Sequence, residues 1–189
     1  FRDHHACHAY YGLLAQPRTD GERLIFTANG FGDGANASIW TGRHDYPLTE
    51  ILHTDRCHIG RMYRYCTLLL GMKPAEHEYK VMGLAPYANP EYSQKAFQVY
   101  AETLQVDGLD FSYNVEPRDN FFHFRERLAS QRFDAIAYGI QRRCEELITE
   151  WMANGVDQTG LRNIIFSGGV AQNIKANKRV WELDQVDGI

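Results

Sequence analysis

The stretch Ile164 to Asn177 reads IIFSGGVAQNIKAN, and it decides the fold class of this chain of 189 residues. The apolar run NIIFS is typical of a short buried strand, which we expect to end at Ser167. A glycine pair follows, and a helix is then predicted up to about Leu183. A strand, a glycine turn and a helix in this order, with similar units upstream, indicate a mixed α/β domain.

The same stretch has the features of a ligand-binding turn. Gly168 and Gly169 carry no Cβ, so the backbone can approach a ligand closely there. The free N–H groups where the next helix starts favour an anion. Asn173 and Asn177 share one helix face, from which they could bond a ribose, a phosphate or a second loop. We predict a phosphate or nucleotide site; the alternative is a tight turn with solvated asparagines.

Apolar runs and helical spacings alternate along the rest of the chain. Strands are expected at Leu24 to Ala28, 37–42, Leu48 to His53 and 109–115. Helices are expected at 6–16, Ile59 to Leu70, about Glu91 to Leu104, and Phe133 to Trp151. The first helix is expected to bury Tyr10, Leu13 and Leu14. Residues 73–90 and 155–160 are expected to be irregular.

A second glycine-rich loop lies in ANGFGDGANASIW, residues 28–40. It carries Gly30, Gly32 and Gly34, with the acidic Asp33 between them. Backbone N–H groups of such a loop can wrap phosphate oxygens, and Asp33 could hold a cation or a water. The alternative is an ordinary hairpin turn between two strands.

Three histidines stand close together in DHHACHAYYG, residues 3–12. On a helix, His4 and His8 are four residues apart, so both rings lie on one face, as paired metal ligands require. His5 points elsewhere, and Cys7 is expected to pack rather than to bind. Two histidines are half a site, and a further ligand, often a carboxylate, must come from elsewhere. The alternative is a helix start whose histidines bond the backbone.

One lysine stands out in EYKVMGLAPY, residues 78–87. Lys80 could neutralise a phosphate or anchor an acyl phosphate. The alternative is an ordinary exposed lysine beside a packed loop.

The composition narrows the function classes. A net charge of −4 argues against a broad nucleic-acid face. No apolar run approaches the roughly 20 residues of a membrane span, and no signal peptide opens the chain. The four cysteines are dispersed, which favours reduced thiols in a cytoplasmic protein. Because the chain begins at Phe1, we expect a piece of a longer protein.

Taken together and in order, these motifs resemble the O-carbamoyltransferase family, which includes the nodulation-factor and antibiotic carbamoyltransferases. The matching stretches are HHACHA (4–9), NGFGDGANASIW (29–40), EYKVMGLAPYA (78–88), AYGIQRRCEELI (137–148) and FSGGVAQNIKAN (166–177). Two other families share the glycine pair and the His-x-x-x-His element more loosely. They are the tRNA threonylcarbamoyladenosine synthases and the hydrogenase-maturation carbamoyltransferases.

The resemblance implies an actin-like, ribonuclease-H-like fold of the sugar kinase and heat-shock ATPase superfamily, here as an incomplete domain. Residues 1–189 would be part of the N-terminal carbamoyl-transfer domain. A YrdC-like C-terminal domain, absent from this chain, would make carbamoyl-adenylate from carbamoyl phosphate and ATP. The acceptor would be a hydroxyl on a small molecule, with sugar, aminoglycoside, macrocycle and nodulation factor all fitting.

The resemblance also implies roles for residues. His4 and His8 match the metal-binding histidines, with iron as the usual ion, and with Lys80 they are the candidate catalytic residues. The turn and helix that hold the adenylate match Gly168, Gly169, Val170, Asn173 and Asn177. The loop that faces the phosphate matches Gly30, Gly32 and Asp33.

The chain departs from the family at Asn29, where an Asp is usual. An amide oxygen can still coordinate a metal, but it brings no charge. A further ligand Asp of the family would follow Ile189. We therefore expect this chain alone to bind metal weakly or not at all and not to complete the reaction.

The implied reaction is attack of the acceptor hydroxyl on the carbamoyl carbon, with the metal acting as a Lewis acid. The general base stays open, with His5 or a metal-bound hydroxide as candidates. One alternative is a threonylcarbamoyl transferase acting on tRNA, against which the acidic balance counts. Another is a non-catalytic nucleotide-binding lobe, which would not require the histidine pair.

Overall fold

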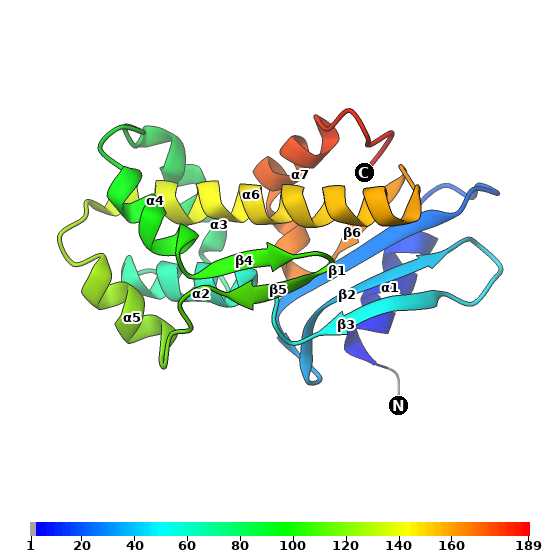
Figure 1. Cartoon of the computed structure of the whole chain (residues 1–189), viewed down its shortest axis with the longest axis horizontal. Helices are drawn as coiled ribbons and strands as arrows, with labels where there is room; N and C mark the ends of the chain where they lie inside the picture. Colours follow the sequence, from blue (N-terminus) through cyan, green and yellow to red (C-terminus); the bar gives the residue numbers. More distant parts are fainter. Residues whose placement is uncertain (1–2) are drawn as a thin grey trace.

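A four-stranded mixed sheet organises the chain in the computed structural model, which describes residues 3–189. Its strands are β1 (Arg23–Gly32), β2 (Ala35–Gly42), β3 (Thr49–Thr54) and β6 (Ile164–Ser167), in the order β3-β2-β1-β6. The first three form an antiparallel meander, and β6 lies parallel to β1 (Figure 1). The predicted α/β class is confirmed.

Both faces of β1 are buried, because a helix covers each side of the sheet. Leu24 and Phe26 face α6 (Phe133–Thr159), whereas Ile25 between them faces α1 (His4–Leu14). The Phe26 ring lies edge-on to Trp151 of α6, with centroids 4.8 Å apart. Burying a side chain of this size contributes roughly 1.5–3 kcal/mol, so β1 is anchored from both faces.

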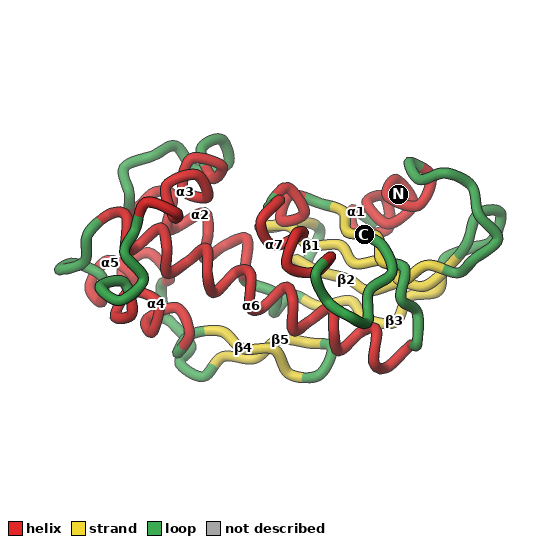
Figure 2. The backbone as a smooth tube through the Cα atoms, turned by 90° about the horizontal axis from the view of Figure 1, so that it is seen from above, coloured by secondary structure: helices red, strands yellow, loops and turns green. Residues whose placement is uncertain are grey.

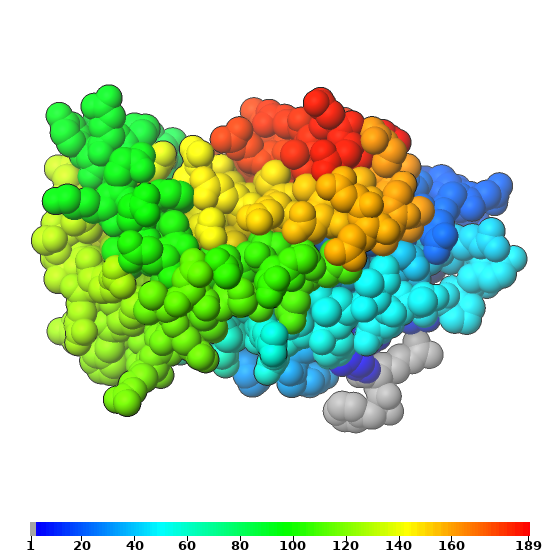
Figure 3. Space-filling view, in the orientation of Figure 1, coloured from blue at the N-terminus to red at the C-terminus, as the bar shows by residue number. Residues whose placement is uncertain are grey.

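Helix α6 runs along most of the molecule and joins the sheet to a helical part (Figures 1 and 2). The helical part contains α2 (Ile59–Leu69), α3 (Glu78–Leu84), the 3₁₀ turn η1 (Ala85–Tyr87), α4 (Gln94–Ala101) and α5 (Asn120–Arg127). A hairpin of β4 (Leu104–Asp107) and β5 (Asp110–Tyr113) lies along α6, where Trp151 Nε1 donates to the Leu109 carbonyl at 2.7 Å. In the space-filling view, the C-terminal segment with α7 (Ile174–Trp181) packs directly on α6 (Figure 3).

Several expected boundaries differ from the structure. Residues 73–77 and 88–90 are irregular as expected, but residues 78–87 are helical, because Val81 of α3 is fully buried and packing onto α6 stabilises a helix there. Residues 155–159 continue α6, which ends at Gly160 with a positive φ of 71°. Leu14 is 67% exposed, so the buried side of α1 carries Leu13 but not Leu14. Helix α5 was not expected. No helix within residues 3–189 is long and apolar enough to cross a membrane.

Candidate functional site

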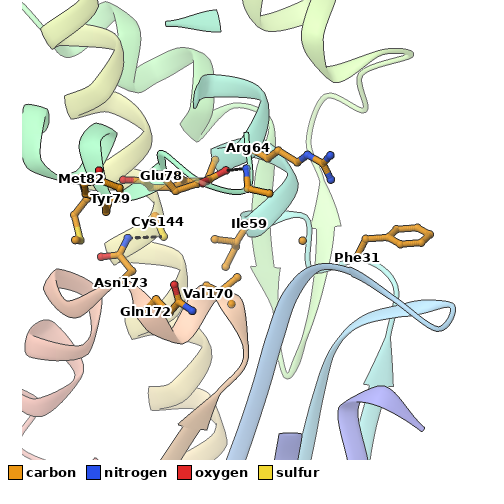
Figure 4. A pocket seen from close by; sticks show the side chains of 15 residues that line it. Phe31, Ile59, Arg64, Glu78, Tyr79, Met82, Cys144, Val170, Gln172 and Asn173 are labelled. Atoms are coloured by element: carbon orange, nitrogen blue, oxygen red, sulfur yellow. Dashed lines mark hydrogen bonds between the residues drawn. The ribbon is translucent and has the colours of Figure 1, made fainter. Parts of the chain in front are cut away.

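A cavity of about 410 Å³ lies where the sheet meets the helical part (Figure 4). Its walls come from the end of β1, the first turns of α2, one side of α3, the middle of α6 and the turn after β6. They include Gly30, Phe31, Ile59, Gly60, Tyr63, Arg64, Glu78, Tyr79, Met82, Cys144, Gly169, Val170, Gln172 and Asn173. Four residues predicted from sequence meet here: Gly30, Gly169, Val170 and Asn173.

The turn after β6 depends on Gly168. Its φ is +101°, and a Cβ there would lie 2.5 Å from the Ala28 carbonyl oxygen, so only glycine fits. The chain then makes a short 3₁₀ turn, η2 (Gly169–Gln172), before α7 begins at Ile174. The α-helix therefore starts directly after GGVAQN, as the sequence indicated, and the glycine pair shapes the cavity wall.

Asn173 lies at the cavity, but its amide is bonded within the protein. Its Oδ1 caps α7 by accepting from Ala176 N at 3.2 Å and also accepts from Gln141 Nε2 at 3.0 Å. Its Nδ2 donates to Gln141 Oε1 at 3.1 Å. Asn177 Nδ2 donates to the Ala171 carbonyl at 2.8 Å. Both asparagines therefore hold the turn in place, Asn173 through α6 and Asn177 through the turn itself.

Asn29 connects the glycine turn to the histidine pair. Its Oδ1 accepts from Gly169 N–H at 2.6 Å, and its Nδ2 lies 3.0 Å from His4 Nε2. Because the backbone N–H can only donate, the amide orientation is determined, and Nδ2 must donate to His4. His4 Nε2 is therefore an acceptor, and the ring proton of neutral His4 is on Nδ1.

The histidine pair forms as predicted on one face of α1. The helix begins at His4 because Asp3 Oδ1 accepts from Ala6 N at 2.8 Å as its N-cap. The rings of His4 and His8 are edge-on, with centroids 4.7 Å apart. Partial burial, and next the neighbouring His4, lower the pKa of His8, which favours the neutral imidazole that metals bind. Within residues 3–189, no three His, Cys, Asp or Glu side chains group closely enough to hold a metal ion.

His5 is buried in the core and does not reach the cavity. Trp40 Nε1 donates to Ser38 Oγ, Ser38 bonds Thr27 Oγ1, and Thr27 bonds His5 Nδ1, each at 2.6 Å. Since the indole can only donate, Ser38 Oγ is the acceptor in the bond with Trp40. Burial lowers the pKa of His5. The side chain is fully buried, which counts against His5 as the general base, because a base must come within hydrogen-bond reach of the proton it takes.

Three further predicted residues, Lys80, Asp33 and Gly32, lie outside the cavity lining. Lys80 is exposed on α3, with its Nζ 5.9 Å from the Tyr79 ring centroid. Asp33 and Gly34 have φ values of 36° and 84° and form the two-residue turn between β1 and β2. The loop is thus a hairpin turn, and only its β1 end, at Gly30 and Phe31, reaches the cavity. Gly32 instead lies against His4, whose Cδ2 would be 2.6 Å from a Cβ there.

The sequence also left important residues unassigned. Ile59 and Tyr63 stand four apart on α2 and form an apolar wall with Met82 of α3. Tyr63 Oη donates to Gln141 Oε1 at 2.8 Å, and burial raises the pKa of Tyr63. The spacing of Ile59 and Tyr63 is that of any two residues on the buried face of a helix. The sequence therefore contains no local signal that distinguishes cavity-lining residues from core residues. Cys7, expected to pack, is exposed, whereas Cys144 lines the cavity.

These features define an α/β domain in which two glycine-bearing strand ends meet at one cavity and a histidine pair is linked to it. The family model described as carbamoyltransferase N-terminus matches residues 1–189, and the chain belongs to this family. The resemblance seen in the sequence is confirmed.

Similar proteins occur in bacteria and archaea. The chain is 30% identical over 197 residues to a protein of Synechocystis sp., covering 95% of this chain and 31% of that protein. It is 26% identical over 199 residues to a protein of Methanocaldococcus jannaschii, covering 95% and 32%. It is 27% identical over 191 residues to the nodulation protein NolNO of Sinorhizobium fredii, covering 95% and 27%. The chain thus spans about a third of the length of the curated relatives it matches.

Proposed function

We propose that this chain is the transfer part of an O-carbamoyltransferase. It would move a carbamoyl group from carbamoyl-adenylate, made from carbamoyl phosphate and ATP, to a hydroxyl of a small-molecule acceptor. The observation that carries the proposal is the Asn29 amide, which bonds both His4 and Gly169 N–H. It joins the candidate metal ligands to a wall of the cavity, so that both can act on one substrate.

The cavity suits one end of an adenylate. Ile59, Tyr63, Met82 and Val170 provide apolar surface for a flat base. The backbone at Gly30 and Gly169 lets a ligand approach without meeting a Cβ. The meander with a parallel fourth strand supports the actin-like, ribonuclease-H-like assignment that we propose for the fold.

His4 and His8 fit a divalent ion as part of its ligand set, and iron accepts such imidazole donors. His4 Nε2 presents a lone pair, now directed at the Asn29 amide, and His8 is partly exposed on the same helix face. Asn29 Oδ1 is engaged by Gly169 N–H, so the amide would have to turn to become a ligand. When bound, the ion would supply Lewis-acid polarisation of the carbamoyl or phosphate oxygen. Asn29 would position the His4 ring, and the glycine turn would hold the donor beside it.

The test compares wild-type whole protein with His4→Ala and His8→Ala. Purified protein is analysed for metal, and transfer from carbamoyl-adenylate to candidate hydroxyl acceptors is followed by mass spectrometry. We expect stoichiometric iron or a similar ion and transfer in the wild type, and loss of both in the variants. His44→Ala, on a loop, is the control that should retain both.

Two results would reject the proposal. Normal transfer by His4→Ala would show that His4 does not act through a bound metal. Nucleotide binding by the wild type, with neither metal nor carbamoylated product, would favour a non-catalytic nucleotide-binding lobe. Including tRNA among the acceptors tests the threonylcarbamoyl alternative, which would place the product on RNA.

A further inference from the structure

A second hollow of about 280 Å³ adjoins the cavity and shares Gly30, Phe31 and Arg64 with it. We call it the arginine groove. Its other lining residues are Arg61, Tyr65, Leu68 and Pro74. A ligand that fills the cavity can therefore extend into this groove without leaving the protein surface.

The two arginines of the groove are not used to hold the fold. Within residues 3–189, the side chains of Arg61 and Arg64 make no hydrogen bond or ion pair, whereas those of Arg142 and Arg162 pair with Glu146 and Asp187. A free guanidinium pair is notable in a chain whose net charge is −4. Unneutralised positive charge at a concave surface attracts an anion.

The local geometry directs both guanidinium groups to the groove. Arg61 and Arg64 are three residues apart on α2, so they share one face of the helix. Arg61 Cζ lies 5.4 Å from the Phe31 ring centroid, and Phe31 is 69% exposed. This cation–π contact keeps Arg61 at the groove. Figure 4 shows Arg64 and Phe31 extending toward the same side of the cavity.

The start of α2 adds to the positive potential. Ile59 and Gly60, in its first turn, line the cavity, and that turn contains no acidic residue. The N-cap residue His58 makes no side-chain cap hydrogen bond. The first N–H groups of a helix carry partial positive charge, so they act in the same direction as the arginines.

The acidic residue among the described cavity-lining residues does not neutralise the arginines. Glu78 Oε1 accepts from the backbone N–H of Ala75 at 2.6 Å, on the α3 side of the cavity. Ala75 itself has a φ of 66°, which this hydrogen bond helps to hold. Glu78 is therefore committed to the loop before α3.

We infer that Arg61 and Arg64 form an anion-binding subsite that recognises the phosphoryl group of a ligand whose other end lies in the cavity. The inference rests on the proposed function insofar as the ligand is a phosphorylated carbamoyl donor. The planar guanidinium presents paired donors that match two phosphate oxygens, which a lysine cannot do. The phosphoryl group can belong to a nucleotide monophosphate ester or to carbamoyl phosphate.

The experiment measures binding of AMP, adenosine and carbamoyl phosphate to the whole protein by calorimetry. Wild type is compared with Arg61→Ala, Arg64→Ala and Arg64→Lys, with Arg125→Ala on α5 as a matched surface control. Circular dichroism melts verify that each variant folds. We expect AMP to bind more tightly than adenosine, and Arg64→Ala to weaken AMP at least about tenfold while leaving adenosine unchanged. Arg64→Lys should restore only part of the loss.

Comparing the three ligands distinguishes the possible outcomes of the experiment. If carbamoyl phosphate alone loses affinity in the arginine variants, the subsite holds that donor, and the adenylate assignment of the cavity is wrong while the anion subsite stands. If AMP and adenosine bind the wild type equally and carbamoyl phosphate binding is unaffected by the variants, the inference is overturned. It is also overturned if neither phosphorylated ligand binds the wild type.

Discussion

Asn29 and Gly169 are 140 residues apart in the sequence, yet the side-chain Oδ1 of the first accepts the backbone N–H of the second at 2.6 Å. The bond ties the end of β1 to the turn after β6. Because the same amide donates to His4, one side chain aligns the two strand ends and the histidine pair.

Replacing Asn29 by Asp should strengthen metal binding by the whole protein. A carboxylate still accepts Gly169 N–H and adds the negative charge that a hard or borderline cation prefers. Titration calorimetry with Fe²⁺ or Mn²⁺ should give a higher affinity for Asn29→Asp than for wild type. The exposed Asn114→Asp is the control, and equal affinities in all three proteins would mean that Asn29 does not contact the ion.

Replacing Gly168 by Ala should destabilise the fold. The new Cβ would meet the Ala28 carbonyl at 2.5 Å in a backbone conformation with φ +101°. Strain of this kind costs about 1–3 kcal/mol and should lower the thermal midpoint. Gly21→Ala, whose Cβ would meet nothing within 4 Å, should leave the midpoint nearly unchanged. A midpoint for Gly168→Ala equal to that control would contradict the described turn.

The cysteines should differ sharply in reactivity. Burial raises the pKa of Cys57 and Cys66 to about 12, whereas Cys7 is exposed. Maleimide at neutral pH should therefore label Cys7 first, and the others only after denaturation. Mass spectrometry of peptides identifies the labelled positions. Rapid native labelling of Cys57 or Cys66 would show that the core between α2 and α6 opens readily.

The buried thiols of Cys57 and Cys66 should also make the folded protein less stable at alkaline pH. Their pKa is higher in the folded protein than the ordinary 9.0, so the unfolded chain loses these protons first as pH rises. The free energy of unfolding should fall from about pH 9 upward. Denaturant titrations at several pH values measure the slope, and Cys57→Ala should reduce it.

Acid should destabilise the protein partly through His58. Burial, and next the charge of Arg61, lower the pKa of His58, whose Nδ1 hydrogen-bonds Tyr113 Oη. The unfolded chain therefore binds this proton more tightly, and stability is lost as pH falls below about 6.5. His58→Gln should flatten the dependence of unfolding free energy on pH between about 5 and 7. An unchanged slope would assign the acid sensitivity to other groups.

Local patterns predicted much of the fold. The apolar runs of β1, β2 and β6 and the periodicity of α2 and α6 are properties of neighbouring residues, so they can be read directly. Helix α3 could not be predicted in this way, because its stretch contains Gly83 between Pro74 and Pro86. What stabilises it is the packing of Val81 onto α6. The end of α6 was missed because Gly155 in GVDQTG resembles a helix stop.

The features of the candidate site likewise differ in whether local sequence or tertiary packing determines them. The sequence by itself determined the α/β class, the family, both glycine turns and the placement of His4 and His8 on one helix face, because each depends on residues close in the chain. Tertiary structure alone decided that Gly30 meets Gly169, that His5 is buried and bonded to Thr27, and that Arg61 and Arg64 lie beside the cavity. These relationships depend on how strands and helices distant in sequence pack together. That packing sets how far each side chain is buried, which groups it bonds and how its pKa is shifted.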